Sequence, residues 1–149
     1  MKIRALVLDD NAQVRNAISD LLKYRGYEVY EFFDPSVCPV YLERDCPCEH
    51  EYACADIIIT DIDMPNVTGF EFIENQKKRS CKVENIAMIS GAWTRDSREQ
   101  AESLGCEIFY KPFDFNSFTV WLDECEKRIK PNRKLSDWFK QKENASSLK

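Results

Sequence analysis

The stretch that decides the fold is ADIIITDIDMP, residues 55–65. Its three consecutive isoleucines, Ile57 to Ile59, form an uninterrupted run of β-branched side chains, which is typical of a parallel strand covered on both faces. Asp61 comes where the predicted strand, residues 55–60, ends. A carboxylate directly after a buried strand is therefore the first candidate for a functional group in this chain.

Similar strand patterns recur along the chain and alternate with helical patterns. Beside residues 55–60, strands are predicted over residues 3–8, 27–33, 85–90 and 108–110. Apolar residues at helical spacing predict helices over residues 14–22, after Gly69, and over residues 118–129, and a polar helix over residues 94–104. Parallel strands need crossover connections, and right-handed crossovers place helices on both faces of the sheet. The sequence therefore predicts an α/β protein with one parallel sheet.

The carboxyl ends of the predicted strands carry five polar side chains. Asp9 and Asp10 follow the first strand, Asp61 the third, Ser90 ends the fourth, and Lys111 follows the fifth. In open parallel sheets, ligands bind beyond the carboxyl ends of the strands, where the strand order reverses. We therefore expect three carboxylates, a hydroxyl and an ammonium group to meet at one edge of the sheet.

These side chains predict a particular chemistry. Crowded carboxylates repel each other, so at neutral pH either a pKa rises or a divalent cation lies between them. Mg²⁺ suits such a site, because it prefers oxygen ligands and usually takes one or two carboxylates together with a phosphoryl oxygen. One carboxylate then remains as a nucleophile, while Lys111 offers positive charge and Ser90 a hydroxyl donor. The pattern predicts aspartyl-phosphate chemistry.

Four motifs occur in order, each at the predicted end of a strand: Leu8-Asp9-Asp10, Thr60-Asp61-Ile62-Asp63-Met64-Pro65 with Gly69 beyond it, Ile89-Ser90-Gly91, and Lys111-Pro112-Phe113. Together they make residues 1–130 resemble the receiver domain of two-component response regulators, in the stand-alone form that is similar to chemotaxis regulators. The resemblance implies a flavodoxin-like, doubly wound, five-stranded parallel sheet of (βα)5 form with strand order 2-1-3-4-5.

The same resemblance implies the metal site. Asp10 and Asp61 are expected to bind Mg²⁺ directly, and Asp9 through a water molecule. The backbone carbonyl of Asp63 would complete the protein ligands. An aspartate at a strand end often only caps the following helix, which is the simpler interpretation of each residue taken alone. Asp61-Ile62-Asp63 also has the Asp-x-Asp form of haloacid dehalogenase phosphatases, but its late position in the chain and the following Met-Pro argue against that class.

The resemblance also implies the reaction and the partners. Asp61 would be the phosphoacceptor, with Ser90 and Lys111 holding the phosphoryl oxygens during in-line attack on a phosphohistidine, followed by hydrolysis. The expected partners are a sensor histidine kinase or phosphotransfer protein and a downstream protein target. The family usually has an aromatic residue three positions before this lysine, whereas here Ile108 stands there. Coupling through that aromatic residue is therefore in doubt.

A cysteine-rich insertion, residues 38–54, lies where the second helix would be. It offers four cysteines as ligands for a second metal, Zn²⁺ or an iron–sulfur cluster, with two alternates: Cys38, Cys46, Cys48 and Cys54, and His50 or Cys81. The alternative is that these are reduced thiols that pack as small apolar groups. A metal or redox sensor built on a receiver scaffold, with this segment as its input, is therefore the second functional hypothesis.

Composition and charge argue against membrane, secreted and nucleic-acid-binding proteins. No apolar run approaches the roughly 20 residues of a membrane span, and the first one ends at Asp9-Asp10, too soon for a secretory signal. We therefore expect a cytoplasmic protein without a membrane partner. The net charge is -5, but residues 127–149 hold eight Lys or Arg against two Asp or Glu. Most of this basic segment belongs to a C-terminal tail, residues 131–149, which we expect to be solvated and too short for an effector domain. Nucleic acid is an unlikely partner.

Overall fold

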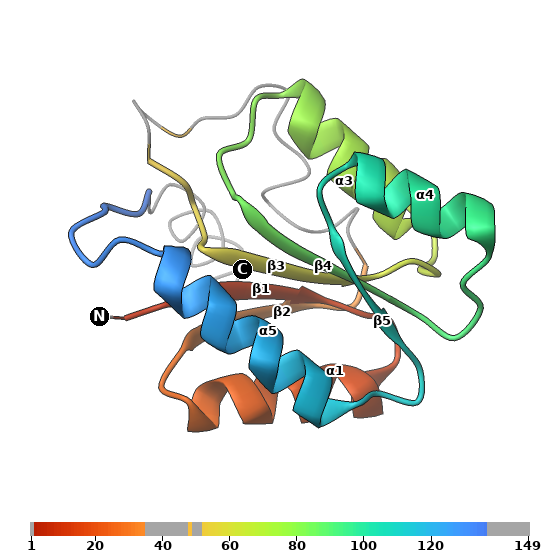
Figure 1. The fold of residues 1–149 in the computed structure, drawn as a ribbon, viewed down its shortest axis with the longest axis horizontal. Coiled ribbons are helices and arrows are strands. Elements are labelled where there is room, and N and C mark those ends of the chain that lie inside the picture. The colour runs from red at the N-terminus through yellow and green to blue at the C-terminus, as the bar shows by residue number, and fades with distance from the viewer. Residues whose placement is uncertain (1, 35–47, 49–51, 137–149) are drawn as a thin grey trace, which may run out of the picture.

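The structure is a computed structural model that describes residues 2–34, 48 and 52–136 (Figure 1). Five parallel strands form one sheet in the order β2-β1-β3-β4-β5. They are β1 (Arg4–Leu8), β2 (Glu28–Phe32), β3 (Ile57–Asp61), β4 (Asn85–Ser90) and β5 (Glu107–Tyr110). The predicted flavodoxin-like fold and its strand order are therefore confirmed.

Helices cover both faces of this sheet. Among the described residues they are α1 (Ala12–Tyr24), α3 (Gly69–Lys78), α4 (Arg95–Ser103) and α5 (Phe115–Arg128). Helices α1 and α5 lie on one face, and α3 and α4 lie on the other (Figure 1). No helix in the described part of the chain is both long and apolar enough to cross a membrane.

Each of these helices begins at a polar side chain that accepts a hydrogen bond from a backbone N–H of the first turn. The four caps are Asn11, Thr68, Thr94 and Asp114. Such caps satisfy amide groups that have no partner inside the helix. Helices α1, α4 and α5 start directly beyond the carboxyl edge of the sheet, whereas α3 starts after a longer loop that follows Asp61.

The core forms two apolar layers, one on each face of the sheet. In β3, Ile57 and Ile59 pack against the layer under α1 and α5, and Ile58 packs against the layer under α3 and α4. All three are fully buried. A strand that is covered on both faces needs apolar side chains at every position, which is the physical reason for the uninterrupted isoleucine run.

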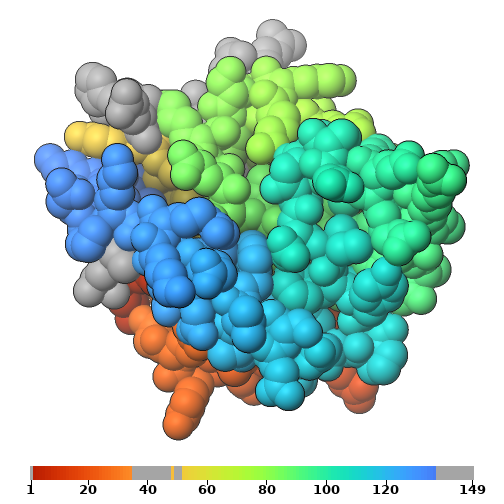
Figure 2. All heavy atoms as spheres, viewed as in Figure 1, coloured from red at the N-terminus to blue at the C-terminus, as the bar shows by residue number. Residues whose placement is uncertain are grey.

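The C-terminal residues of the described chain are attached to the amino-terminal edge of the sheet. Arg133 donates two hydrogen bonds to the buried carboxylate of Asp56. Leu135 forms an isolated parallel bridge with Ala53, and the Ser136 amide donates to the Ala53 carbonyl at 2.8 Å. Figure 2 shows these residues in blue beside the yellow segment that leads into β3. The beginning of the tail, which we expected to be solvated, is thus held against the domain.

Candidate functional site

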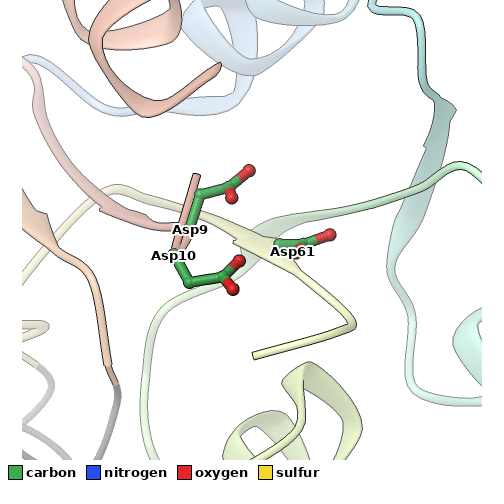
Figure 3. A group of neighbouring side chains, drawn as sticks. All are labelled: Asp9, Asp10 and Asp61. Carbon is green, nitrogen blue, oxygen red and sulfur yellow. The ribbon is translucent and has the colours of Figure 1, made fainter. Parts of the chain in front are cut away.

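Three carboxylates meet at the carboxyl edge of the sheet. Strands β1 and β3 are neighbours, with Leu8 opposite Thr60, so that Asp9 and Asp10 after β1 lie beside Asp61 at the end of β3. Each side chain offers one oxygen, and these three oxygens lie within 4.8 Å of one another. Figure 3 shows the three side chains together at these strand ends. Asp61 is the last residue of β3, one position further into the strand than the sequence predicted.

The three carboxylates differ in exposure. The side chain of Asp9 is 1% exposed and that of Asp61 is 3% exposed, whereas Asp10 is exposed. Burial and, to a smaller degree, the charge of Asp9 raise the pKa of Asp61 to about 6, although Lys111 partly offsets both effects. Burial also raises the pKa of Asp9. The site therefore holds two carboxylates whose ionised forms are disfavoured by their surroundings.

Lys111 supplies the positive charge that lies between them. Its Nζ atom is 3.3 Å from Oδ2 of Asp9 and 3.3 Å from Oδ1 of Asp61. Burial alone would lower the pKa of Lys111, but attraction to Asp61 and Asp9 outweighs burial and raises it. Lys111 is therefore a cation at neutral pH that lies between the two buried carboxylates.

The acidic group fits a hard divalent cation. Although Lys111 is near, Oδ2 of Asp9 and Oδ1 of Asp61 are buried and accept no well-directed hydrogen bond. Both oxygens share the Lys111 ammonium at 3.3 Å, and because poorly satisfied buried oxygens are costly, a cation at this position would satisfy them further. The donors are all carboxylate oxygens, which is the ligand type that Mg²⁺ prefers. Asp9, Asp10 and Asp61 are thus the residues that could hold Mg²⁺.

Neighbouring groups fix the orientation of Asp9. The Asn11 amide donates to Oδ1 of Asp9 at 2.8 Å, which leaves the other carboxylate oxygen for the centre of the site. Arg15 donates from Nη1 to the Asp9 carbonyl at 2.7 Å, and its guanidinium lies 3.8 Å from Glu31 on the neighbouring strand β2. Sequence reasoning missed Arg15, because a single arginine on a helix gives no signal of where its side chain reaches.

A tight loop after Asp61 closes this side of the site. A Cβ atom at Gly69 would overlap the carbonyl group of Asp61, so only glycine fits there. The Gly69 amide donates to the Ile62 carbonyl at 2.9 Å. Asp63 lies in this loop with an exposed side chain that is not part of the carboxylate group. The role expected for its backbone carbonyl stays a prediction.

Ser90 and Lys111 come from adjacent strand ends. Ser90 is the last residue of β4 and is 3% exposed. The Lys111 amide donates to the Ser90 carbonyl at 3.0 Å, which joins the ends of β4 and β5. Oγ of Ser90 accepts a hydrogen bond from the Ala92 amide at 3.0 Å. The structure thus places Ser90 and Lys111 at neighbouring strand ends along the sheet edge.

The position of Ile108 follows strand alternation. Ile108 packs against the apolar layer under α3 and α4, whereas Phe109 is buried in the layer under α1 and α5. Tyr110 is about half exposed. Phe109 therefore does not replace the ring that is absent at position 108, because it lies on the opposite face of the sheet.

The cysteine-rich segment gives no support to a second metal in the part that is described. Cys48 and Cys54 are buried in the apolar layer under α3 and α4, and Cys81 is partly buried against it. Within residues 2–34, 48 and 52–136, the acidic trio is the only group of three His, Cys, Asp or Glu side chains close enough to share an ion. Cys38, Cys46 and His50 lie outside the described residues, so the predicted Zn²⁺ or iron–sulfur site stays a prediction.

Comparison with known proteins shows the family. A family model described as the response regulator receiver domain matches residues 5–122. The chain therefore belongs to the response regulator receiver family of two-component signalling, as its four motifs indicated. The structure agrees with this family. Helices cover both faces of a sheet with strand order 2-1-3-4-5, and three carboxylates meet at its carboxyl edge.

Similar proteins are larger than this chain. The CAI-1 autoinducer sensor kinase/phosphatase CqsS of Vibrio cholerae is 33% identical over 128 residues, covering 80% of this chain and 17% of that protein. The regulatory protein VanRc of Enterococcus gallinarum is 22% identical over 123 residues, covering 76% of this chain and 46% of that protein. The chain thus spans less than half the length of either relative.

Solved structures share the fold. The chemotaxis protein CheY4 of Vibrio cholerae superposes with a TM-score of 0.67 at 24% identity, covering 84% of this chain and 99% of that one. The signal receiver domain of a LuxO repressor protein from Vibrio parahaemolyticus gives a TM-score of 0.72 at 14% identity, covering 86% and 92%. At these identities the likeness concerns the fold alone.

Proposed function

We propose that this chain accepts a phosphoryl group on Asp61 from a sensor histidine kinase or a phosphotransfer protein, in a reaction that requires Mg²⁺. The phosphorylated domain then acts in the cytoplasm through contacts with a downstream protein. The observation that carries the proposal is the position of the Lys111 ammonium, 3.3 Å from both buried carboxylates at the sheet edge. An acidic cluster that served only to cap helices would not need a partly buried cation aimed at it.

The chemistry follows from the positions of these groups. A carboxylate oxygen of Asp61 attacks the phosphorus of the donor; a P–O bond forms, and the bond to the leaving imidazole or carboxylate breaks with its electron pair. Mg²⁺, when bound, neutralises the phosphoryl oxygens. Lys111 stabilises the charge on the transferred group, and Ser90 at the end of β4 supplies a hydroxyl donor. Attack by water on the phosphorus later breaks its bond to Asp61, releases inorganic phosphate and restores the Asp61 carboxylate.

Electrostatics link the metal to the reactivity of Asp61. Without a cation, burial and the charge of Asp9 raise the pKa of Asp61 to about 6, so part of the population is protonated and not nucleophilic below that pH. A divalent cation favours the ionised form. Mg²⁺ would therefore both bind the phosphoryl group and keep the nucleophile charged.

Incubation with a small acyl phosphate tests the proposal without knowledge of the kinase. With Mg²⁺ we expect the addition of one phosphoryl group, measured by intact-protein mass spectrometry, and its loss when the metal is chelated. Asp61→Asn should not be phosphorylated. Asp63→Asn is the matched control, since it removes a nearby carboxylate that lies outside the buried group, and it should still accept the phosphoryl group. Labelling of Asp61→Asn at the wild-type level would refute the proposal.

The metal or redox sensor remains the alternative, but no contact among the described residues favours it. Burial raises the pKa of Cys106 and of Cys125 to about 11, so both thiols are protonated and unreactive at neutral pH. Zinc and iron content of protein purified without chelators would decide whether the cysteine-rich segment binds metal, and only near-stoichiometric metal would support it.

A further inference from the structure

Trp93 connects the loop after β4 to two other elements. Its indole N–H donates to the carbonyl oxygen of Phe109 in β5 at 2.7 Å. Its ring lies edge-on to Phe70 of α3, with 6.5 Å between the ring centroids and 85° between their planes. The partly buried Trp93 side chain is thus held by a hydrogen bond to β5 and by an apolar ring contact with α3.

This loop begins directly after Ser90, the last residue of β4, which carries the hydroxyl of the proposed site. Trp93 is three residues after Ser90, and the intervening Ala92 amide donates to Oγ of Ser90 at 3.0 Å. Because Ala92 directly precedes Trp93, the contact that holds Trp93 also restrains the peptide that orients the Ser90 hydroxyl. That bond occupies an acceptor position on the oxygen and leaves the hydroxyl proton available to donate.

The residue that accepts the Trp93 hydrogen bond, Phe109, lies close to Lys111 in the chain. Phe109 is two residues before Lys111, and the Lys111 amide is bound to the Ser90 carbonyl at 3.0 Å. A Cβ atom at Gly91 would lie 3.7 Å from Cβ of Lys111, so the loop passes directly over the end of β5. The indole hydrogen bond therefore forms a second link between β5 and the loop, beyond the backbone bond.

We propose that Trp93 is a positioning residue for phosphoryl transfer. By tying the loop to β5, it sets the separation of the Ser90 hydroxyl and the Lys111 ammonium, so that both can hold oxygens of one phosphoryl group. Trp93 itself touches neither the carboxylates nor the transferred group. The inference rests on the proposed function of Asp61, and it adds a residue from outside the four motifs.

Trp93→Phe is the informative substitution, because it removes the indole donor and retains an aromatic ring against Phe70. Trp121→Phe is the matched control: it makes the same chemical change on the opposite face of the sheet, in the layer under α1 and α5. Rates are measured at saturating acyl phosphate and Mg²⁺ and divided by the folded fraction. The Mg²⁺ affinity is measured separately by calorimetry.

We expect Trp93→Phe to lower the saturated phosphorylation rate roughly two- to tenfold, the range that corresponds to one hydrogen bond. Mg²⁺ affinity should be unchanged, because the Asp9, Asp10 and Asp61 carboxylates do not contact the loop through Trp93. Trp121→Phe should keep the wild-type rate. An unchanged rate in Trp93→Phe would overturn the inference, and so would a loss of rate that is matched by a loss of Mg²⁺ affinity.

A double-mutant cycle separates positioning from general loosening. If Trp93 acts through the hydroxyl, Trp93→Phe should have little further effect in a Ser90→Ala background. A full additional loss in that background would contradict the inference. Failure of the proposed function is distinguishable: wild-type protein that takes up no phosphoryl group overturns both claims, whereas normal labelling of wild type with an unaffected Trp93→Phe overturns this inference alone.

Discussion

The burial of Asp61 predicts that its charge destabilises the metal-free fold at neutral pH. Burial and the charge of Asp9 raise the pKa of Asp61 from the ordinary 3.8 to about 6. Because the folded-state pKa lies above that of the unfolded chain, the unfolded state loses its proton first as the pH rises. The free energy of unfolding should therefore fall as the pH rises from about 4 through 6, and then level off.

The size of this effect follows from the shift. A shift of about two pKa units corresponds to a penalty of about 3 kcal/mol above pH 7 and about 1 kcal/mol at pH 4.5. The side chain is only 3% exposed, so solvent screening reduces this little. Asp61→Asn removes the charge and keeps the size. Its stability advantage over wild type should therefore grow by about 2 kcal/mol between pH 4.5 and pH 7.5.

Urea unfolding in the presence of a chelator measures this difference. Asp114→Asn serves as the control, because the exposed Asp114 carboxylate accepts hydrogen bonds from the Ser117 hydroxyl and from backbone amides of α5, and its pKa is lowered. The advantage of Asp61→Asn should rise with pH, whereas Asp114→Asn should show no such gain. A difference between Asp61→Asn and wild type that does not vary with pH would refute the reasoning.

Three other substitutions test separate parts of the structure. Gly69→Ala should lower the free energy of unfolding by about 1–3 kcal/mol in thermal or urea unfolding, because its methyl group would overlap a backbone carbonyl, whereas Gly91→Ala has room and should be nearly neutral. Lys111→Ala should leave the fold largely intact and slow phosphorylation about a hundredfold, since it removes the charge that holds the phosphoryl oxygens; an unchanged rate would count against that role. Arg133→Ala should destabilise the domain by about 2 kcal/mol, because it leaves a buried carboxylate without its two charged hydrogen bonds, and Lys134→Ala should not.

The sequence predicted the sheet and the site because both depend on local pattern. Ile57 to Ile59 is apolar at every position since the strand is covered on both faces. Asp9, Asp10 and Asp61 could be predicted to meet, because parallel strands end at the same edge and the strand order that the resemblance to receiver domains implies makes β1 and β3 neighbours. The polar helix predicted over residues 94–104 is α4 in the structure, and Thr94 caps it.

Contacts made by long side chains could not be predicted in this way. Arg15 reaches the Asp9 carbonyl, and Trp93 reaches the Phe109 carbonyl, over distances that depend on how a helix or a loop sits on the sheet. The attachment of residues 133–136 to the amino-terminal edge depends on a buried acceptor, Asp56, far away in sequence. Sequence periodicity identifies the buried face of a helix or strand and the point where it ends, but it does not show which distant residue a long side chain contacts.

The central claim is that Asp61, rather than a neighbouring carboxylate, receives the phosphoryl group. Reduction with borohydride converts an aspartyl phosphate to homoserine and leaves free aspartate unchanged, so peptide mass spectrometry after treatment with an acyl phosphate and Mg²⁺ identifies the acceptor. We predict homoserine at position 61, and none when the metal is chelated. Homoserine at position 9, 10 or 63, or at no position in protein that binds Mg²⁺, would contradict the claim.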